Sequence, residues 1–268
     1  MDTASRALTD ASFRARYEVA ELLGEGGMGA VYRGIQKALG RPVAIKFMTC
    51  ELATDRGWVD RFLIEAKVAA SLLHPNVVVV FDSGMAGDVP FLVTELVDGK
   101  PLHKLLKEEC PLRASRALGI ARGVLSGLEA IHGMGIVHRD LKPANLLVCA
   151  GEPPTAKILD FGLAKMLGVQ GGACQPPKTE TGIIVGTPDY MAPEQAAGDP
   201  VSAATDLYAF SLVLCRMILG RPPFKAESTL EWLRAQIHEE PSFPPDLRPG
   251  VLALLQKGLA KLPGDRFS

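Results

Sequence analysis

A chain of 268 residues, of which 47% are hydrophobic and 22% charged, is long and apolar enough to fold as one large domain or two lobes. The formal net charge of −1 gives no overall electrostatic reason to expect a nucleic acid or a membrane surface as a partner. The five cysteines are scattered singly, which argues against a disulfide framework or a zinc site and favours a reducing, cytoplasmic compartment.

The N-terminus lacks the apolar run of a signal peptide, and no segment reaches the length of a membrane span. The longest apolar stretch, residues 207–219, carries Arg216 and is therefore expected to form a buried helix. The chain is still compatible with being the soluble part of a longer, membrane-tethered protein. Residues 1–16 are polar and lack periodicity, which predicts a flexible leader before the fold begins at Tyr17.

Glycines separate the first two predicted strands. The run Gly-Glu-Gly-Gly-Met-Gly at residues 24–29 is followed by Val31 and Tyr32, which favour a second strand over the helix of a dinucleotide-binding fold. Glycines in such a hairpin let backbone N–H groups approach phosphate oxygens. This motif alone does not distinguish a phosphate-binding loop from an ordinary glycine-rich hairpin.

A lysine lies in the middle of the third predicted strand, residues 42–48. Burying the Lys46 ammonium is costly unless it is paired, and the helix predicted over residues 58–73 offers Glu65 beside its apolar face. An ion pair between Lys46 and Glu65 is the hypothesis. The alternative is two unrelated surface charges.

The rest of the chain divides at about residue 97. Strands over residues 77–81 and 91–97 complete a five-stranded first lobe with one main helix. From residue 98 onward the pattern is mostly helical and includes a long helix over residues 111–132. The sequence thus predicts an α+β protein with a small antiparallel lobe, residues 17–97, and a larger helical lobe, residues 98–268.

The loop from Val137 to Val148 places an acid, a base and an amide between two apolar segments. Pro143 breaks any helix there, so we expect an ordered polar loop, and such a loop suggests chemistry. A strand near residue 158 then ends at Asp160. Residues 166–186 are rich in Gly, Pro and Thr, which predicts a mobile loop.

Six motifs, spread over residues 17–267 and in the order usual for the family, resemble those of the eukaryotic-type serine/threonine protein kinases. The residues within the motifs are similar to those of bacterial members. The motifs are Gly24-x-Gly26-x-x-Gly29-x-Val31, Val43-Ala44-Ile45-Lys46, Glu65, His138-Arg139-Asp140-x-x-x-x-Asn145, Asp160-Phe161-Gly162 and Ala192-Pro193-Glu194. The resemblance implies a two-lobed protein kinase fold and transfer of the γ-phosphoryl group of ATP to protein Ser/Thr hydroxyls.

In this family, residues of the polar loop share the catalytic work. Asp140 would accept the proton of the substrate hydroxyl, and Lys142 would contact the γ-phosphate. Asn145 and Asp160 would hold Mg²⁺, whose charge offsets that of the phosphates.

The first lobe would bind ATP. Lys46, oriented by Glu65, would contact the α- and β-phosphates, and Thr94 would gate the pocket behind adenine. Val31 and Ala44 would sandwich the ring, although core positions explain them equally well. The implied nucleotide site comprises Gly24, Gly26, Gly27, Met28, Gly29, Val31, Ala44, Lys46, Thr94, Glu95, Leu96 and Val97.

Regulation is implied by Arg139, which precedes Asp140. In kinases with this arginine, a phosphate on the loop between Asp160 and Glu194 pairs with it and orders the loop. Thr179 and Thr181 lie where bacterial relatives carry such sites, so we expect autophosphorylation there, through a transient homodimer; otherwise they are ordinary threonines of a polar loop.

The chain departs from the family at two places. Ser211 stands where a glycine is usual, which should only tighten local packing. The sequence also stops at Ser268, where the last helix of the family would begin, so we expect that helix to be missing. Arg266 is retained, and its buried pair with Glu194 is expected to survive.

Two other functions fit these residues less well. A catalytically weak kinase-like scaffold that binds nucleotide and partners usually lacks one of Lys46, Asp140, Asn145 and Asp160, and all four are present. Small-molecule phosphotransferases of related fold lack the Ala-Pro-Glu segment and the threonine-bearing loop before it, and this chain has both.

Overall fold

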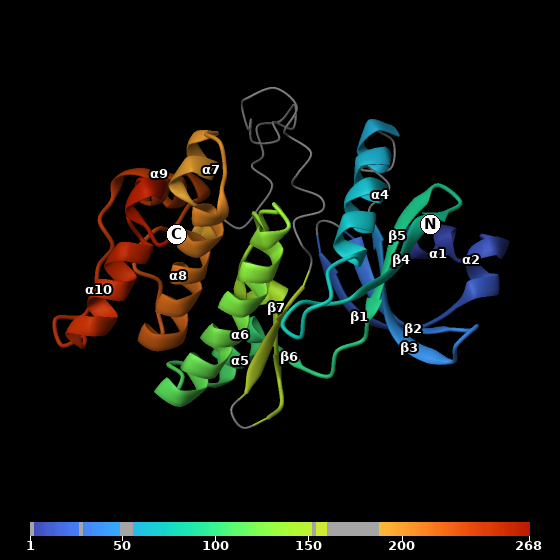
Figure 1. The fold of residues 1–268 in the computed structure, drawn as a ribbon, viewed down its shortest axis with the longest axis horizontal. Helices are drawn as coiled ribbons and strands as arrows, with labels where there is room; N and C mark the ends of the chain where they lie inside the picture. The colour runs from blue at the N-terminus through green and yellow to red at the C-terminus, as the bar shows by residue number, and fades with distance from the viewer. Residues whose placement is uncertain (1–2, 27–28, 49–55, 152–153, 160–187) are drawn as a thin grey trace. The chain divides into compact units, whose positions relative to one another are not determined.

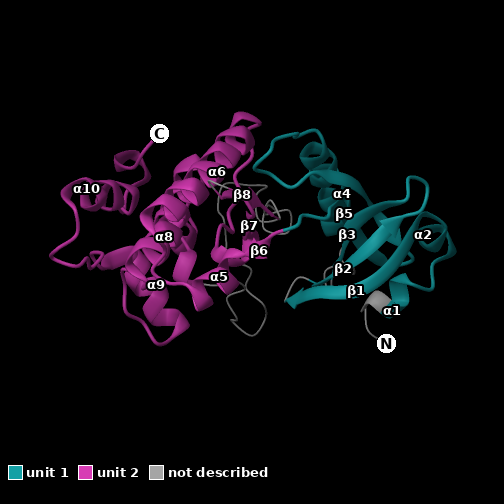
Figure 2. Ribbon diagram, turned by 90° about the horizontal axis from the view of Figure 1, so that it is seen from below, with its two compact units in different colours: residues 1–98 teal, residues 99–268 magenta. Residues whose placement is uncertain are grey.

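The computed structural model describes residues 3–26, 29–48, 56–151, 154–159 and 188–268 (Figure 1). These residues divide into two compact units, Met1–Asp98 and Gly99–Ser268, coloured separately in Figure 2. Unit 1 contains a five-stranded antiparallel sheet and unit 2 is mostly helical, so the predicted α+β architecture is confirmed.

The sheet of unit 1 has the strand order β1-β2-β3-β5-β4 with every neighbouring pair antiparallel. Side chains alternate across it: Val43, Ile45 and Phe47 of β3 enter the buried cluster on one face, so Lys46 projects from the other. The strands are β1 (Tyr17–Gly26), β2 (Gly29–Gln36), β3 (Arg41–Met48), β4 (Val80–Ala86) and β5 (Val89–Glu95).

The segment before Tyr17 is not a flexible leader where it is described. It forms two short helices, α1 (Thr3–Ala7) and α2 (Ala11–Arg16), with Asp10 capping the second by accepting from the N–H of Phe13 at 2.7 Å. Phe13 is fully buried, with ring centroids 5.3 Å from Phe47 and 5.0 Å from Phe91. The segment therefore completes the core of the sheet, a role that a few apolar residues among polar ones did not reveal.

Helix α4 (Arg56–Ala70) packs beside β4 and ends three residues earlier than predicted. Its buried face consists of Trp58, Phe62, Ala66 and Ala69, with the Trp58 and Phe62 rings stacked at 5.4 Å. Glu65 lies between two of these residues and is half-buried.

Unit 2 combines helices with a small three-stranded sheet, β6-β7-β8, of which the sequence pattern indicated only the strand near residue 158, β8. None of the helices in the described part of the chain is both long and apolar enough to span a bilayer. The elements are β6 (Lys100–Pro101), α5 (Leu102–Glu108), α6 (Ala114–Gly133), η1 (Pro143–Asn145), β7 (Leu146–Cys149), β8 (Thr155–Ile158), η3 (Pro188–Tyr190), α7 (Pro193–Ala197), α8 (Ala203–Leu219), α9 (Thr229–His238), α10 (Pro249–Gly258) and η4 (Pro263–Asp265).

Helix α8 is the buried helix predicted over residues 207–219. Thr205 closes its first turn by accepting from the N–H of Ser202 at 3.0 Å, and Gly220 ends it in the left-handed region. Ser211 donates to the carbonyl of Leu207 and faces Gly258, where an added Cβ would lie 2.1 Å from the Ser211 hydroxyl oxygen. The extra side chain at Ser211 is thus accommodated by the absence of one on α10.

Candidate functional site

The polar loop between α6 and β7 is anchored by a buried histidine. His138 is fully buried, and its Nδ1 accepts from the N–H of Asp140 at 3.3 Å. Nε2 therefore carries the ring proton and donates to the carbonyl of Leu159 at 3.0 Å. This histidine joins the start of the loop to Leu159, the residue between β8 and Asp160.

Asp206, in the first turn of α8, holds the loop by hydrogen bonds to its backbone. Its carboxylate accepts from the backbone N–H groups of His138 and Arg139, at 2.8 and 2.9 Å, and from Nε2 of His132 at 2.8 Å. Arg139 has a φ of 64°, a conformation that costs a side-chain-bearing residue free energy. Three hydrogen bonds to one buried carboxylate hold this strained backbone in place.

Two other predicted site residues of unit 2, Lys142 and Asn145, contact the side chain of Asp140. Lys142 Nζ lies 3.0 Å from Oδ2 of Asp140, and Asn145 Nδ2 donates to that same oxygen at 3.1 Å. The same amide nitrogen also donates to the Asp140 backbone carbonyl at 2.8 Å. The Asp140 and Lys142 side chains are 13% and 22% exposed, so the carboxylate is oriented by its neighbours and still reachable from solvent.

Arg139 faces a different environment. Gln195 Nε2 donates to its carbonyl at 2.9 Å, which ties the loop to α7. Nε and Nη1 of Arg139 are buried and have no hydrogen-bond partner among the described residues. Buried donors of this kind are costly, and an anion such as a phosphate group would satisfy them.

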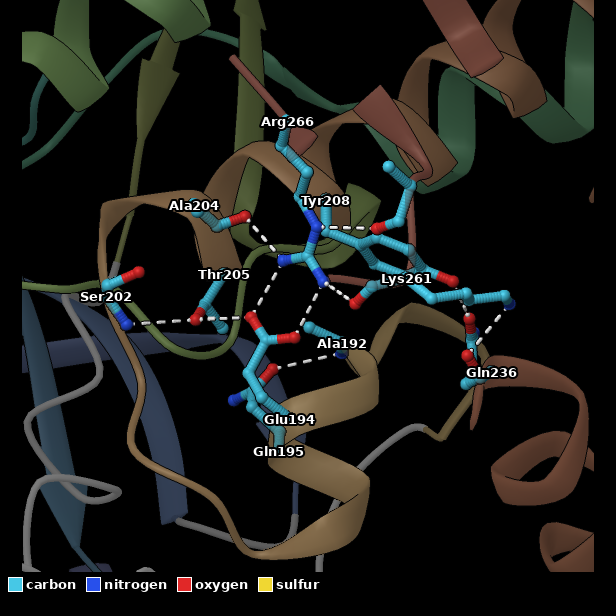
Figure 3. Close-up of polar contacts among 11 residues, drawn as sticks. Ala192, Glu194, Gln195, Ser202, Ala204, Thr205, Tyr208, Gln236, Lys261 and Arg266 are labelled. Carbon is cyan, nitrogen blue, oxygen red and sulfur yellow. Dashed lines mark hydrogen bonds and ion pairs between the residues drawn. The ribbon is translucent and has the colours of Figure 1, made fainter. Parts of the chain in front are cut away.

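The predicted pair between Glu194 and Arg266 is confirmed (Figure 3). Nη1 and Nη2 of Arg266 lie 2.8 Å from Oε1 and Oε2 of Glu194, and Thr205 donates to Oε1 at 2.8 Å. Burial favours the neutral acid, but the hydrogen bonds from Arg266, the Glu194 backbone and Thr205 outweigh it and lower the pKa of Glu194. The pair fixes α7 against the C-terminal residues.

The predicted phosphate-binding hairpin joins β1 to β2 in unit 1. Gly29 has a φ of 137°, and a Cβ there would lie 1.9 Å from the carbonyl oxygen of Phe47. An added Cβ at Gly24 or Gly26 would meet nothing within 4 Å, so packing does not require those two glycines. Close approach of a ligand to the backbone is a reason that remains for them.

The other predicted nucleotide residues lie on the central strands. Lys46 is opposite Val31 on β2 and Leu92 on β5, and Ala44 is opposite Thr94. Lys46 and Glu65 are both half-buried in unit 1, and their ion pair stays a prediction.

Beyond β5, Leu96 and Val97 are half-buried and have no regular structure. Glu95 pairs with Val79 in both directions: its side chain accepts from the Val79 N–H, and its own N–H donates to the Val79 carbonyl, each at 2.9 Å. These two hydrogen bonds hold the backbone at the end of β5. Gly27, Met28, Asp160, Thr179 and Thr181 lie outside the described residues.

Comparison with known proteins decides the family. Residues 17–268 match the protein kinase domain. The chain belongs to the protein kinase family. This kinase chain is 40% identical to the serine/threonine-protein kinase pkn3 of Myxococcus xanthus, and 37% identical to the serine/threonine-protein kinase PknB of Mycobacterium tuberculosis strain H37Rv. A probable serine/threonine-protein kinase of Streptomyces coelicolor is 38% identical.

Each of these alignments covers 94% of the kinase chain, so the bacterial serine/threonine resemblance found in the sequence is confirmed. They cover 47% of pkn3, 41% of PknB and 38% of the Streptomyces protein. The chain therefore spans less than half the length of these curated relatives.

The sequence pattern gave no role to His132 or Gln195. His132 donates to Asp206, the carboxylate that holds the catalytic loop, and Gln195 donates to the carbonyl of Arg139 in that loop. His132 carries the one available signal, because it is a polar residue in the last turn of an otherwise apolar helix face. Gln195 has no comparable signal, since its contact with Arg139 joins residues 56 positions apart.

Proposed function

We propose that this domain transfers the γ-phosphoryl group of ATP to serine and threonine hydroxyls of proteins. The observation that carries the proposal is the convergence of Lys142 and Asn145 on the Asp140 carboxylate. A carboxylate held by two donors and partly exposed to solvent is suited to accept a proton from an entering hydroxyl. Lys142, next to it, supplies a positive charge for the phosphoryl group.

Mg²⁺ is the metal that this family uses, and the residues present fit it. Asn145 uses its amide nitrogen twice on Asp140, which leaves its amide oxygen as the ligand-forming atom. Together with Asp160 it offers the oxygen donors that Mg²⁺ prefers. The ion would neutralise phosphate charge when bound.

The ATP site is assigned to unit 1: Lys46, oriented by Glu65, at the phosphates, the hairpin of Gly24–Gly29 over them, and the 94–97 segment at adenine. The open space around Gly24 and Gly26 supports this assignment. We place the domain in the cytoplasm, where ATP and reduced cysteines are both available, tethered in a longer protein.

Radiolabelled ATP with a generic protein acceptor tests the activity. Asp140→Asn and Lys46→Met should each lose at least about a hundredfold in rate, as expected when a proton acceptor or a phosphate contact is removed. The exposed-site variant Asp246→Asn is the matched control and should label like wild type. Equal labelling by all four proteins contradicts the proposal, and thermal unfolding confirms that the variants are folded.

We further propose that the domain phosphorylates its own Thr179 or Thr181, through a transient homodimer, and that Arg139 receives the phosphate. The unpartnered buried Nε and Nη1 of Arg139 support this role. Mass spectrometry of protein incubated with ATP should find phosphate on one or both threonines, and Arg139→Gln should remove the activation that follows. Full activity with both threonines unmodified contradicts it.

A further inference from the structure

The peptide group between Arg139 and Asp140 is held on both of its sides by side chains of unit 2. Its N–H, which belongs to Asp140, donates to Nδ1 of His138 at 3.3 Å. Its carbonyl, which belongs to Arg139, accepts from Nε2 of Gln195 at 2.9 Å. The planar group can turn only by breaking one of these bonds, so the two contacts set the direction in which the Asp140 side chain leaves the backbone.

This peptide group needs support because the backbone before it is strained. Arg139 has a φ of 64°, in the left-handed region that a residue with a side chain enters only at a cost. Asp206 holds the N–H groups of His138 and Arg139, on the N-terminal side of the strained residue. Gln195 holds the Arg139 carbonyl, on the C-terminal side. Together the two side chains keep Arg139 in its left-handed conformation.

The chemistry of a carboxamide explains why glutamine suits position 195. The Arg139 carbonyl can only accept a hydrogen bond and the Ala192 N–H can only donate one. Gln195 meets both needs: Nε2 donates to the Arg139 carbonyl, and Oε1 accepts from the N–H of Ala192 at 3.2 Å (Figure 3). The second bond caps the first turn of α7. Because the two bonds use different atoms of one side chain, substitution can remove them separately.

The segment from which Gln195 reaches the loop is anchored independently. Glu194, the residue before it, forms the buried ion pair with Arg266. Upstream, Gln236 of α9 is fully buried and donates to the carbonyl of Asp189 at 3.1 Å, which holds the turn η3. Gln195 thus has a fixed base for its contact with a loop residue 56 positions away in the sequence.

We propose that Gln195 is a positioning residue for the phosphoryl transfer: its amide nitrogen holds the Arg139 carbonyl so that the Asp140 carboxylate faces the acceptor hydroxyl. It acts through the backbone of the catalytic loop and not by contact with the substrate. Loss of the donor lets the peptide group turn towards a less strained conformation, which moves the carboxylate away from its productive direction. This inference rests on the proposed protein kinase activity.

Three substitutions separate the two hydrogen bonds of Gln195. Gln195→Glu keeps an oxygen for the Ala192 N–H and places the other oxygen against the Arg139 carbonyl, so the cap survives and the loop contact is lost. Gln195→Lys has the reverse chemistry, because an ammonium donates to the carbonyl and cannot accept from Ala192. Gln195→Met removes both bonds without adding a charge. Gln256→Glu, at an exposed position of α10, is the matched control.

Stability and activity should rank these variants differently. In thermal unfolding, Gln195→Glu should resemble wild type, whereas Gln195→Lys and Gln195→Met should melt earlier, because α7 loses its cap. The kcat for a serine peptide is measured at a temperature where all variants are folded. It should fall roughly tenfold in Gln195→Glu and Gln195→Met, the loss expected for one hydrogen bond, and stay near wild type in Gln195→Lys.

Hydrogen exchange followed by NMR gives a readout that does not depend on activity. In Gln195→Glu the Asp140 N–H should exchange faster than in wild type, while the Ala192 N–H keeps its protection. Gln256→Glu should match wild type in every measurement. The inference is overturned if Gln195→Glu has the wild-type kcat, or if kcat follows stability across the three variants. If instead Asp140→Asn phosphorylates the peptide as fast as wild type, the proposed activity itself has failed.

Discussion

Glu194 and Arg266 lie 72 residues apart in the sequence and form a two-pronged ion pair at 2.8 Å, with side chains 5% and 0% exposed. Arg266 also donates to the carbonyls of Ala204, Ala260 and Lys261. Five hydrogen bonds thus converge on one guanidinium, which joins α7, α8 and the end of the chain (Figure 3).

Replacing Arg266 with methionine should therefore lower the free energy of unfolding by about 3–5 kcal/mol, since it leaves the buried Glu194 carboxylate unpaired. Urea unfolding followed by circular dichroism measures the loss. Arg234→Ala, an exposed arginine on α9, is the control and should change stability by less than about 0.5 kcal/mol. The double variant Glu194→Gln/Arg266→Met should be more stable than Arg266→Met alone; a double variant as unstable as the sum of the two single losses would contradict the pairing.

The pair also predicts an acid dependence of stability. The pKa of Glu194 is lower in the folded protein than its ordinary value of 4.5, so the folded state favours the carboxylate. The unfolded chain then takes up protons more readily, and the stabilisation present above 4.5 is lost as pH falls through the folded pKa. Between pH 6 and pH 3, wild type should lose more stability than Glu194→Gln. Parallel curves for the two proteins would show that Glu194 does not contribute.

This ion pair was predictable because both partners belong to recognisable motifs. The same holds for Asp140, Lys142 and Asn145, which lie within six positions of one another, so local spacing already brings them together. The hydrogen bonds to the Asp206 carboxylate are different, because they join residues 67 and 68 positions apart. A single buried acid in an apolar helix does not reveal from which backbone N–H groups it will accept. Long-range hydrogen bonds of this kind need the tertiary structure.

Short elements were equally hard to predict. The strands β6 and β7 contain two and four residues, too few for alternation to be visible. The helices before Tyr17 contain five and six residues, so their periodicity is not defined either. Their positions depend on burial of Ala7 and Phe13 against the sheet, which is a tertiary effect.

Weakening the hydrogen bonds between Asp206 and the catalytic loop should lower kcat even under conditions in which the variant is fully folded. In Asp206→Asn the amide presents only one acceptor oxygen to the backbone N–H groups of His138 and Arg139, and the strained φ of Arg139 loses support. We expect a loss of about 1–3 kcal/mol of stability. The kcat should fall by roughly tenfold or more at a temperature where the variant is fully folded. An unchanged kcat in the folded variant would show that the loop is held by other contacts.

Phe13 tests whether the N-terminal helices belong to the fold. Phe13→Ala removes a fully buried ring from contact with Phe47 and Phe91, which should cost about 3–5 kcal/mol. Leu8→Ala, at a side chain that is 38% exposed, is the control and should cost less than about 1 kcal/mol. Differential scanning fluorimetry compares them. Equal melting temperatures for Phe13→Ala and Leu8→Ala would mean that the segment is not part of the core in solution.

The hairpin glycines separate a packing requirement from a ligand requirement. Gly29→Ala forces a Cβ to within 1.9 Å of the Phe47 carbonyl at a φ of 137°, so it should destabilise unit 1 by about 1–3 kcal/mol or more.

Gly24→Ala places its Cβ in open space and should leave the unfolding free energy within about 1 kcal/mol of wild type. If the hairpin covers the phosphates, Gly24→Ala should nevertheless raise the KM for ATP, because a methyl group there displaces the nucleotide and not the protein. Urea unfolding and ATP titration of the kinase rate measure the two effects on the same variants. A Gly24→Ala protein with wild-type KM and wild-type stability would show that neither packing nor nucleotide binding needs that glycine, and would remove the hairpin from the proposed ATP site.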